Sequence, residues 1–170
     1  MSCVKLVCLM NDDEIIKNFK DGKVGIFPTD TAFGMGCRID EVSAIERIYK
    51  IRNRPEEKAL IALVSSVEMA EQFVTIPREV KVHLIEKYWP GGLTIILNCY
   101  QEKIPSIVRA NGPTLAVRWP DQRKLCRIIE GVGVPIVAPS ANFSGKKTPL
   151  ELNEVDKNLL TAVDFVVSGV

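Results

Sequence analysis

Residues 60–64 read Leu-Ile-Ala-Leu-Val, an uninterrupted apolar run between a charged stretch and the pair Ser65-Ser66. A short, continuous apolar run of this kind is typical of a β-strand that is buried on both faces. Sheets that are covered on both faces occur mainly in domains where helices alternate with strands along the chain. The run therefore predicts an α/β domain with its sheet in the interior.

Strand and helix patterns alternate on both sides of this run. Further strands are predicted at residues 4–9, 24–27, 93–99, 115–118 and 134–138, with a last one beginning at Phe165. Helices are predicted at residues 12–20, 41–52, 77–88, 121–130 and 151–160, with a short one that Ser66 opens. No helix separates residues 93–99 from residues 115–118, so these strands are expected to be antiparallel. The expected fold is a single α/β (α+β) domain in which helices flank a twisted mixed sheet.

Two local features add to this pattern. Residues 29–38 are expected to form a loop, in which Gly34 and Gly36 allow the backbone to approach another group closely. Asp40 is expected to cap the helix at residues 41–52, because a carboxylate there can accept hydrogen bonds from free N–H groups.

Length and composition exclude several classes of protein. The chain has 170 residues, of which 46% are hydrophobic and 25% charged, as in one ordinary globular domain. No apolar run reaches the roughly 18 residues that a membrane span requires. The 22 lysines and arginines are balanced by 21 acidic residues. A protein that binds nucleic acid over much of its surface would be more basic, so any site for a polyanion must be local.

Cysteine and histidine usage argues against two kinds of structural site. The five cysteines are scattered without a Cys-x-x-Cys pair, and His83 is the one histidine. An odd number of scattered cysteines disfavours a disulfide framework, and the lack of paired ligands disfavours a zinc site. The N-terminus lacks the features of a signal peptide, so we expect a protein of the reducing cytoplasm.

Polar segments adjoin several predicted strands, where open α/β sheets bind their ligands. Residues 28–36 combine two threonines, an aspartate and two glycines, which suit a small polar substrate and a locally capped turn equally. Among the cations that follow, Arg47 and Lys50 suit a solvated helix face. For Arg54 and Lys58, which precede a strand, anion binding and solvation have equal support.

Two further segments carry polar groups at strand ends. Arg118 ends an apolar strand, where its charge requires either an acidic partner or a bound anion. Residues 138–148 are dense in hydroxyls, with an amide and two lysines, which favours a phosphate-binding loop over a structural one. A Gly-x-Ser-x-Gly elbow and metal-ligand spacing are both missing. The residues therefore predict an enzyme that binds and positions charged reactants without a covalent intermediate.

Five short motifs occur in the order and at the approximate spacing of one family. Together they extend from residue 28 to about residue 148. They are PTDTAFGMG (28–36), RNRPEEKAL (52–60), WPGGLT (89–94), TLAVRWP (114–120) and APSANFSG (138–145). The chain thereby resembles the YrdC-like domain family, that of the bacterial threonylcarbamoyl-AMP synthases.

The resemblance implies a fold of the YrdC/RibB type and a nucleotidyl transfer. L-threonine, bicarbonate and ATP, the last with Mg²⁺ on its phosphates, would give L-threonylcarbamoyladenylate and pyrophosphate. A partner transferase would then modify adenosine 37 of tRNA. Because the threonine carbamate and the α-phosphate are both anionic, the site must offset their repulsion with positive charge.

The resemblance also assigns roles to individual residues, with Arg118 on the substrate carboxylate. The implied contacts to L-threonine are Thr31, Leu63, Arg118 and Ala138. The implied contacts to the nucleotide are Arg54, Lys58, Thr114, Ser140 and Thr148. Catalysis would depend on Arg52, Arg54, Ser140 and Asn142, and no protein ligand for a metal is implied.

The sequence departs from the family pattern in three ways. The family's Lys-x-Arg matches either Arg52-Asn53-Arg54 or Lys50-Ile51-Arg52, and Phe33 occupies a position that is often tyrosine. Family members continue into a strand that closes the site, so the YrdC-like domain at residues 1–170 is expected to lack that C-terminal strand. The main alternative function is a paralogous module that binds RNA or nucleotide without synthase activity. A carbamoyl-transferring enzyme is a weaker alternative.

Overall fold

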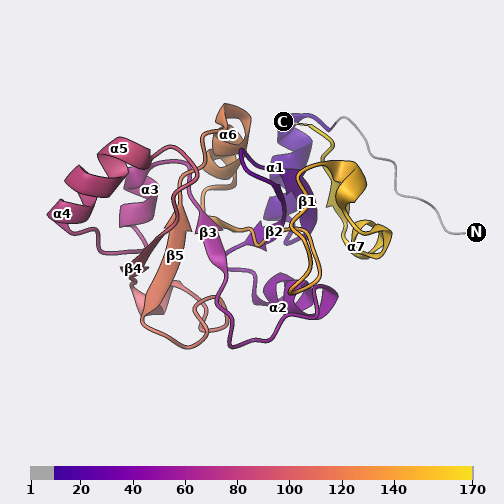
Figure 1. The fold of residues 1–170 in the computed structure, drawn as a ribbon, viewed down its shortest axis with the longest axis horizontal. Coiled ribbons are helices and arrows are strands. Elements are labelled where there is room, and N and C mark those ends of the chain that lie inside the picture. Colours follow the sequence, from indigo (N-terminus) through magenta and orange to yellow (C-terminus); the bar gives the residue numbers. More distant parts are fainter. Residues whose placement is uncertain (1–9, 170) are drawn as a thin grey trace, which may run out of the picture.

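The computed structural model describes residues 10–169 and joins seven strands of that part into one sheet (Figure 1). The strands are β1 (Gly25–Pro28), β2 (Phe33–Arg38), β3 (Ile61–Leu63), β4 (Ile95–Asn98), β5 (Thr114–Arg118), β6 (Ile136–Val137) and β7 (Phe165–Val166). Their order across the sheet is β4-β5-β3-β6-β2-β1-β7. β3 pairs in parallel with β5 and β1 with β7, and the other neighbours are antiparallel. The predictions of a mixed sheet and of an antiparallel β4–β5 pair are therefore confirmed.

Helices cover both faces of this sheet, with α1 and α6 together on one face and α2 on the other (Figure 1). The short helices α3, α4 and α5 gather beside β4 and β5, and α7 lies near the opposite edge. The helices are α1 (Asp12–Lys20), α2 (Val42–Ile51), α3 (Val67–Glu71), α4 (Arg78–Val80), α5 (Glu86–Tyr88), α6 (Arg123–Val132) and α7 (Lys157–Ala162). A π-helical turn, Lys81–Ile85, joins α4 to α5, and 3₁₀ turns occupy Gln101–Lys103 and Leu152–Glu154.

Successive side chains of the strands enter two separate apolar cores, one on each face of the sheet. In β1, Ile26 packs in the core that α2 covers, and Phe27 packs in the core that α1 and α6 cover. In β3, Ala62 and Leu63 divide between the two cores in the same way. This division follows from the period of two in a strand. It confirms that the apolar run at residues 60–64 is buried on both sides.

Residues 33–38 form β2, and the prediction of a loop there is wrong. The two glycines suggested a loop, but they lie inside the strand. A Cβ on Gly36 would lie 2.3 Å from the carbonyl oxygen of Val137 in β6. The expected close approach of backbone is therefore confirmed at Gly36, although the neighbour is another strand.

The cap predicted for α2 is also wrong. Asp40 accepts two hydrogen bonds from the Arg38 guanidinium, at 2.9 and 2.7 Å, and does not bind the helix end. Glu41 is the N-cap residue, and its side chain makes no capping hydrogen bond. The Arg38 guanidinium offers Asp40 two charge-assisted hydrogen bonds in one ion pair, which explains why Asp40 binds Arg38 and not the helix end.

Residues 151–160 do not form the single helix that was predicted. Val155 is buried and extended, and it separates the turn Leu152–Glu154 from α7. Asp156 then begins α7 by accepting a hydrogen bond from the Asn158 N–H at 2.8 Å. Side chains that bind nearby backbone groups compete with a continuous helix, and here they divide it.

The remaining strand predictions are confirmed with bounds that differ by one or two residues, and the strand predicted at residues 4–9 lies outside the described residues. Within residues 10–169, no helix is long and apolar enough to cross a membrane. The absence of a closing C-terminal strand stays a prediction.

Candidate functional site

The turn between β1 and β2 presents two polar side chains next to each other. Its geometry is set by Thr29, whose hydroxyl accepts hydrogen bonds from the Thr31 and Ala32 N–H groups, both at 3.2 Å. The same hydroxyl donates to the Ala32 carbonyl at 2.8 Å. Such hydroxyl-to-backbone bonds hold a tight turn in one shape. Asp30 and Thr31 therefore project from a fixed support.

Arg118, at the end of β5, meets this turn. Its Nη1 donates to the Thr31 hydroxyl at 2.7 Å, and its Nη2 forms an ion pair with Asp30. Its Nε donates to the Gly91 carbonyl at 3.0 Å. The second carboxylate oxygen of Asp30 accepts a hydrogen bond from the Asp121 N–H at 3.0 Å. All three nitrogens of the guanidinium are thus held by two segments, residues 30–31 and Gly91, that are far apart in the sequence.

Asp30 is the member of this group that the sequence reasoning missed. It lies within the motif at residues 28–36, yet no role was assigned to it. The one signal was indirect, since a buried arginine at a strand end needs an acidic partner or an anion. The structure supplies the acidic partner for Arg118.

The loop after β6 is held against β2 by backbone hydrogen bonds. The Met35 N–H donates to the Pro139 carbonyl at 2.8 Å, and the Ala141 N–H donates to the Phe33 carbonyl at 2.8 Å. Further along the loop, the Phe33 N–H donates to the Pro149 carbonyl at 3.0 Å. Because both ends of the loop are bound to the strand, Ser140 and Thr148 line the same pocket as Thr29 and Thr31 of the β1–β2 turn.

Arg52 lies at the C-terminal end of α2 and is buried against this loop. Its Nε donates to the Asn142 carbonyl at 2.9 Å, and its Nη2 donates to the Asn142 side-chain oxygen at 3.1 Å and to the Ser140 hydroxyl at 3.5 Å. Its Nη1 is buried with no hydrogen-bond partner among the described residues. Burial, with a smaller effect from nearby Arg54, lowers the pKa of Arg52 to about 10. Arg52 belongs to both possible registers of the basic motif.

A pocket of about 200 Å³ lies between the β1–β2 turn and the loop after β6. Some of the predicted contacts to L-threonine and some of those to the nucleotide line it together. The predicted residues that line it are Thr31, Arg118, Ala138, Ser140 and Thr148. Residues without an assigned contact also line it, namely Thr29, Ala32, Phe33, Gly34 and Ile61.

Three predicted nucleotide contacts, Arg54, Lys58 and Thr114, lie outside this pocket. Arg54 turns back on its own loop, where it donates to the carbonyls of Lys58 and Ala59 at 3.0 and 2.7 Å. The Lys58 side chain is exposed. The predicted L-threonine contact Leu63 does not line the pocket either.

Leu63 and Thr114 lie where a ligand in the pocket has little access to their side chains. Leu63 is 2% exposed and packs in the core under α1 and α6. Thr114 lies at the opposite end of β5 from Arg118, a separation of about 13 Å at the usual rise per residue. Ile61, two residues before Leu63, lines the pocket in its place.

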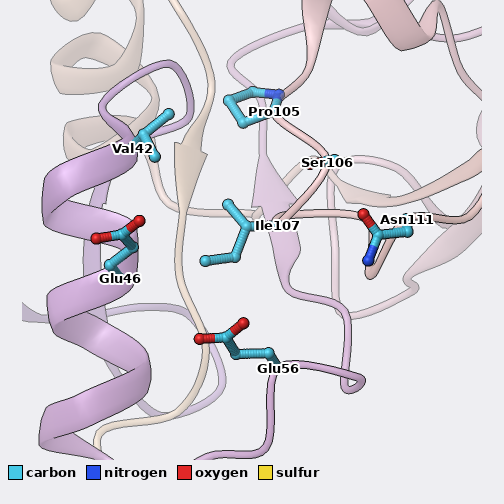
Figure 2. A pocket seen from close by; sticks show the side chains of 7 residues that line it. All are labelled: Val42, Glu46, Glu56, Pro105, Ser106, Ile107 and Asn111. Atoms are coloured by element: carbon cyan, nitrogen blue, oxygen red, sulfur yellow. The ribbon is translucent and has the colours of Figure 1, made fainter.

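A second pocket, of about 420 Å³, lies between α2 and the segment around Ile107 (Figure 2). Glu46, on α2, and Glu56, on the loop that follows it, both line this pocket (Figure 2). None of the predicted site residues lines it. Because carboxylates repel phosphates, this pocket is a poor candidate for the nucleotide.

Known proteins are similar to this chain over most of its length. The family model for Sua5, YciO and YrdC proteins, described as telomere recombination, matches residues 17–170. Threonylcarbamoyl-AMP synthase of Bacillus subtilis is 32% identical over 162 residues, which are 94% of this chain and 47% of that protein. The synthase of Pyrococcus abyssi is 33% identical over 151 residues, which are 88% of this chain and 44% of that protein.

A solved structure is similar over the same region. The crystal structure of Pyrococcus abyssi Sua5 complexed with L-threonine has a TM-score of 0.86 to this chain at 29% sequence identity. The match covers 94% of this chain and 48% of that protein. The chain therefore spans about half the length of the relatives to which it is compared.

Proposed function

Because the chain belongs to the Sua5–YciO–YrdC family, we propose that it is a threonylcarbamoyl-AMP synthase. Its relatives in Bacillus subtilis and Pyrococcus abyssi carry that name, and Pyrococcus abyssi Sua5 has been solved as a complex with L-threonine. The observation that carries the proposal is the pocket between Arg118 and Ser140, where amino-acid and nucleotide contacts implied by the family resemblance lie side by side.

The Arg118 end of the pocket would bind L-threonine. A guanidinium has five N–H donors, and the structure engages three of them with Gly91, Thr31 and Asp30. Two donors remain for the carboxylate of the amino acid. The Thr31 hydroxyl and Ala138, which line the same pocket, would contact the rest of the substrate.

The Ser140 end would bind ATP next to the amino acid. Ser140 and Thr148 offer hydroxyls there, and Arg52 lies behind Ser140 with a buried Nη1 that has no hydrogen-bond partner within residues 10–169. The carbamate oxygen of threonine would attack the α-phosphorus, and the bond from that phosphorus to the pyrophosphate oxygen would break. Both reactants are anionic, so nearby guanidinium charge would lower the barrier by offsetting their repulsion.

The residues of the pocket fit a magnesium ion that arrives with the nucleotide. Hydroxyls, apolar groups and one guanidinium line the pocket, and within the described chain no group of three or more His, Cys, Asp or Glu side chains could hold a metal. Mg²⁺ would therefore be held by the phosphates of ATP. The product would pass to a transferase that modifies adenosine 37 of tRNA, in the cytoplasm.

Several proposed nucleotide and threonine contacts depend on the family resemblance alone. Arg54, Lys58 and Thr114 would contact ATP, and Leu63 would contact L-threonine through its backbone. Asn142 would act with Arg52, with which it already forms two hydrogen bonds.

The proposal is tested by following ATP conversion and pyrophosphate release by the full chain with Mg²⁺. We expect both to require L-threonine and bicarbonate together. ATP hydrolysis that does not depend on threonine would contradict the proposal. Nucleotide or tRNA binding without any product would instead support the alternative of a binding module.

Substitutions at the two ends of the pocket should separate the two substrates. Arg118→Ala is expected to weaken binding of L-threonine mainly, and Ser140→Ala to weaken binding of ATP mainly, because each removes a contact at one end. Isothermal titration of each ligand measures this. The reverse pattern would overturn the assignment of the two ends.

A further inference from the structure

The ion pair between Asp30 and Arg118 differs in burial from the other ion pairs of the described chain. Its side chains are 14% and 10% exposed, whereas every other pair has both partners at least 25% exposed. Burial strengthens the interaction between charges, so each partner controls the electrostatic environment of the other. The carboxylate of Asp30 therefore offsets the positive charge that Arg118 presents to a ligand.

Asp30 reaches Arg118 from a side other than the pocket. Arg118 lines the pocket, whereas Asp30 does not. The second carboxylate oxygen of Asp30 is bound to the Asp121 N–H at 3.0 Å, which ties Asp30 to the segment after β5. A ligand carboxylate can thus approach Arg118 without displacing Asp30.

The ion pair between Asp30 and Arg118 affects whether this end of the pocket prefers a phosphate or a carboxylate. The Coulomb energy at a given distance is proportional to the charge of the ligand. An unpaired guanidinium would therefore attract a multiply charged phosphate more strongly than a singly charged carboxylate. When Asp30 cancels the charge of Arg118, this advantage of phosphates is lost and directional hydrogen bonds decide which ligand binds.

We propose that Asp30 is a positioning and specificity residue, which fixes the Arg118 guanidinium for an amino-acid carboxylate and excludes phosphate anions from that end of the pocket. The inference rests on the proposed function, in which ATP, bicarbonate and pyrophosphate share the pocket with an amino acid. Asp30 keeps these anions from occupying the subsite for the amino acid.

The test uses the full chain and compares Asp30→Asn with Asp30→Glu. Asparagine keeps a hydrogen-bond acceptor but removes the charge, and glutamate keeps the charge but displaces it by one methylene. Asp40→Asn is the matched control, because Asp40 forms an exposed pair with Arg38 away from the pocket. Isothermal titration measures L-threonine and, separately, inorganic pyrophosphate without metal.

For Asp30→Asn we expect pyrophosphate to bind at least about tenfold more tightly than to the wild type and to compete with L-threonine. For Asp30→Glu we expect pyrophosphate to bind as weakly as to the wild type, with L-threonine weakened by about tenfold because the guanidinium is displaced. Asp40→Asn should behave as the wild type in both titrations. A purely structural role would lower the unfolding temperature without changing the ratio of the two affinities.

The inference is overturned if pyrophosphate binds Asp30→Asn and the wild type equally, or if L-threonine binds Asp30→Glu as it binds the wild type. If Asp30→Asn does not fold, the Asp30→Glu titrations decide alone. Failure of the wild type to bind L-threonine would count against the proposed function. The pyrophosphate titrations would still test the role of Asp30 in that case.

Discussion

Arg52 and Arg118 are both buried, but only Arg118 has an acidic partner in the part of the chain that the structure describes. Arg118 is paired with the carboxylate of Asp30, whereas the hydrogen-bond acceptors of Arg52 are the neutral groups of Asn142 and Ser140. Burial lowers the pKa of Arg52 to about 10, which means that the folded protein disfavours its charged form. We infer that the charge of Arg52 costs stability and that a bound phosphate would offset this cost.

Matched substitutions of the two arginines should therefore differ in stability. Arg52→Gln removes a buried charge, so we expect the free energy of unfolding to stay within about 1 kcal/mol of the wild type or to rise. Arg118→Gln leaves Asp30 without its partner, so we expect a loss of about 3–5 kcal/mol. Urea unfolding, followed by the fluorescence of Trp89 and Trp119, measures both. Similar losses in the two variants would show that Arg52 also has a structural role.

At the scale of a residue, the family motifs group side chains that are far apart in the sequence and that contact one another in the structure. Arg52, Ser140 and Asn142, which the resemblance groups together, are joined by hydrogen bonds. Asp30 could not be assigned to Arg118 in this way, because the choice of counter-ion depends on which segments the fold brings together.

Among the elements, β2 shows most clearly how a local pattern can mislead. Its glycines favoured a loop, yet the strand is buried and pairs with β1 and β6. Gly36 is required by the neighbouring strand, since an added Cβ would lie 2.3 Å from the Val137 carbonyl oxygen. Gly34 has no such restriction, because the nearest atom to its Cβ would lie 3.6 Å away, on Ala138.

The two glycines provide a controlled pair of substitutions. Gly36→Ala is expected to lower the free energy of unfolding by about 1–3 kcal/mol or more, because backbone must move to relieve the overlap. Gly34→Ala, in the same strand, should change it by less than about 1 kcal/mol. Thermal or urea unfolding of both variants tests this. Equal effects would mean that strand propensity, and not the approach of β6, explains Gly36.

The segment that carries Thr148 is held in place by Glu154. The carboxylate of Glu154 pairs with Lys147 at 2.8 Å and accepts hydrogen bonds from the Leu150 and Glu151 N–H groups at 2.7 and 3.3 Å. Lys147, followed by these two N–H groups, lowers the pKa of Glu154 from 4.5 to about 2. The carboxylate is thus ionised in the folded chain at a lower pH than in the unfolded chain.

This shift predicts a specific dependence of stability on pH. The contribution of Glu154 should be fully present above about pH 4.5 and should be lost as the pH falls toward 2. Glu154→Gln should therefore lose less stability than the wild type on acidification across that range. Urea unfolding at a series of pH values measures this, with Glu130→Gln, on the exposed side of α6, as the control. The same acid dependence in wild type and Glu154→Gln would contradict the assignment.

At the scale of the whole molecule, the strand order creates the candidate site. β5 and β6 lie on either side of β3, and the β1–β2 turn meets the end of β5. The amino-acid end and the nucleotide end of the pocket thus come from segments that are remote in the chain. The alternation of helices and strands predicted the fold class and the mixed sheet, but it contained no information about this order.

The sequence by itself determined the two-sided burial of the sheet, the main helices and the family motifs, because these depend on local periodicity and on short runs of residues. The tertiary structure alone decided that residues 33–38 are a strand, that Asp30 neutralises Arg118, and that Thr114 lies away from the pocket. Asp30 and Arg118 are separated by 88 residues, as are Arg52 and Ser140. Contacts at that separation are set by the order and register of the strands, which no local pattern specifies.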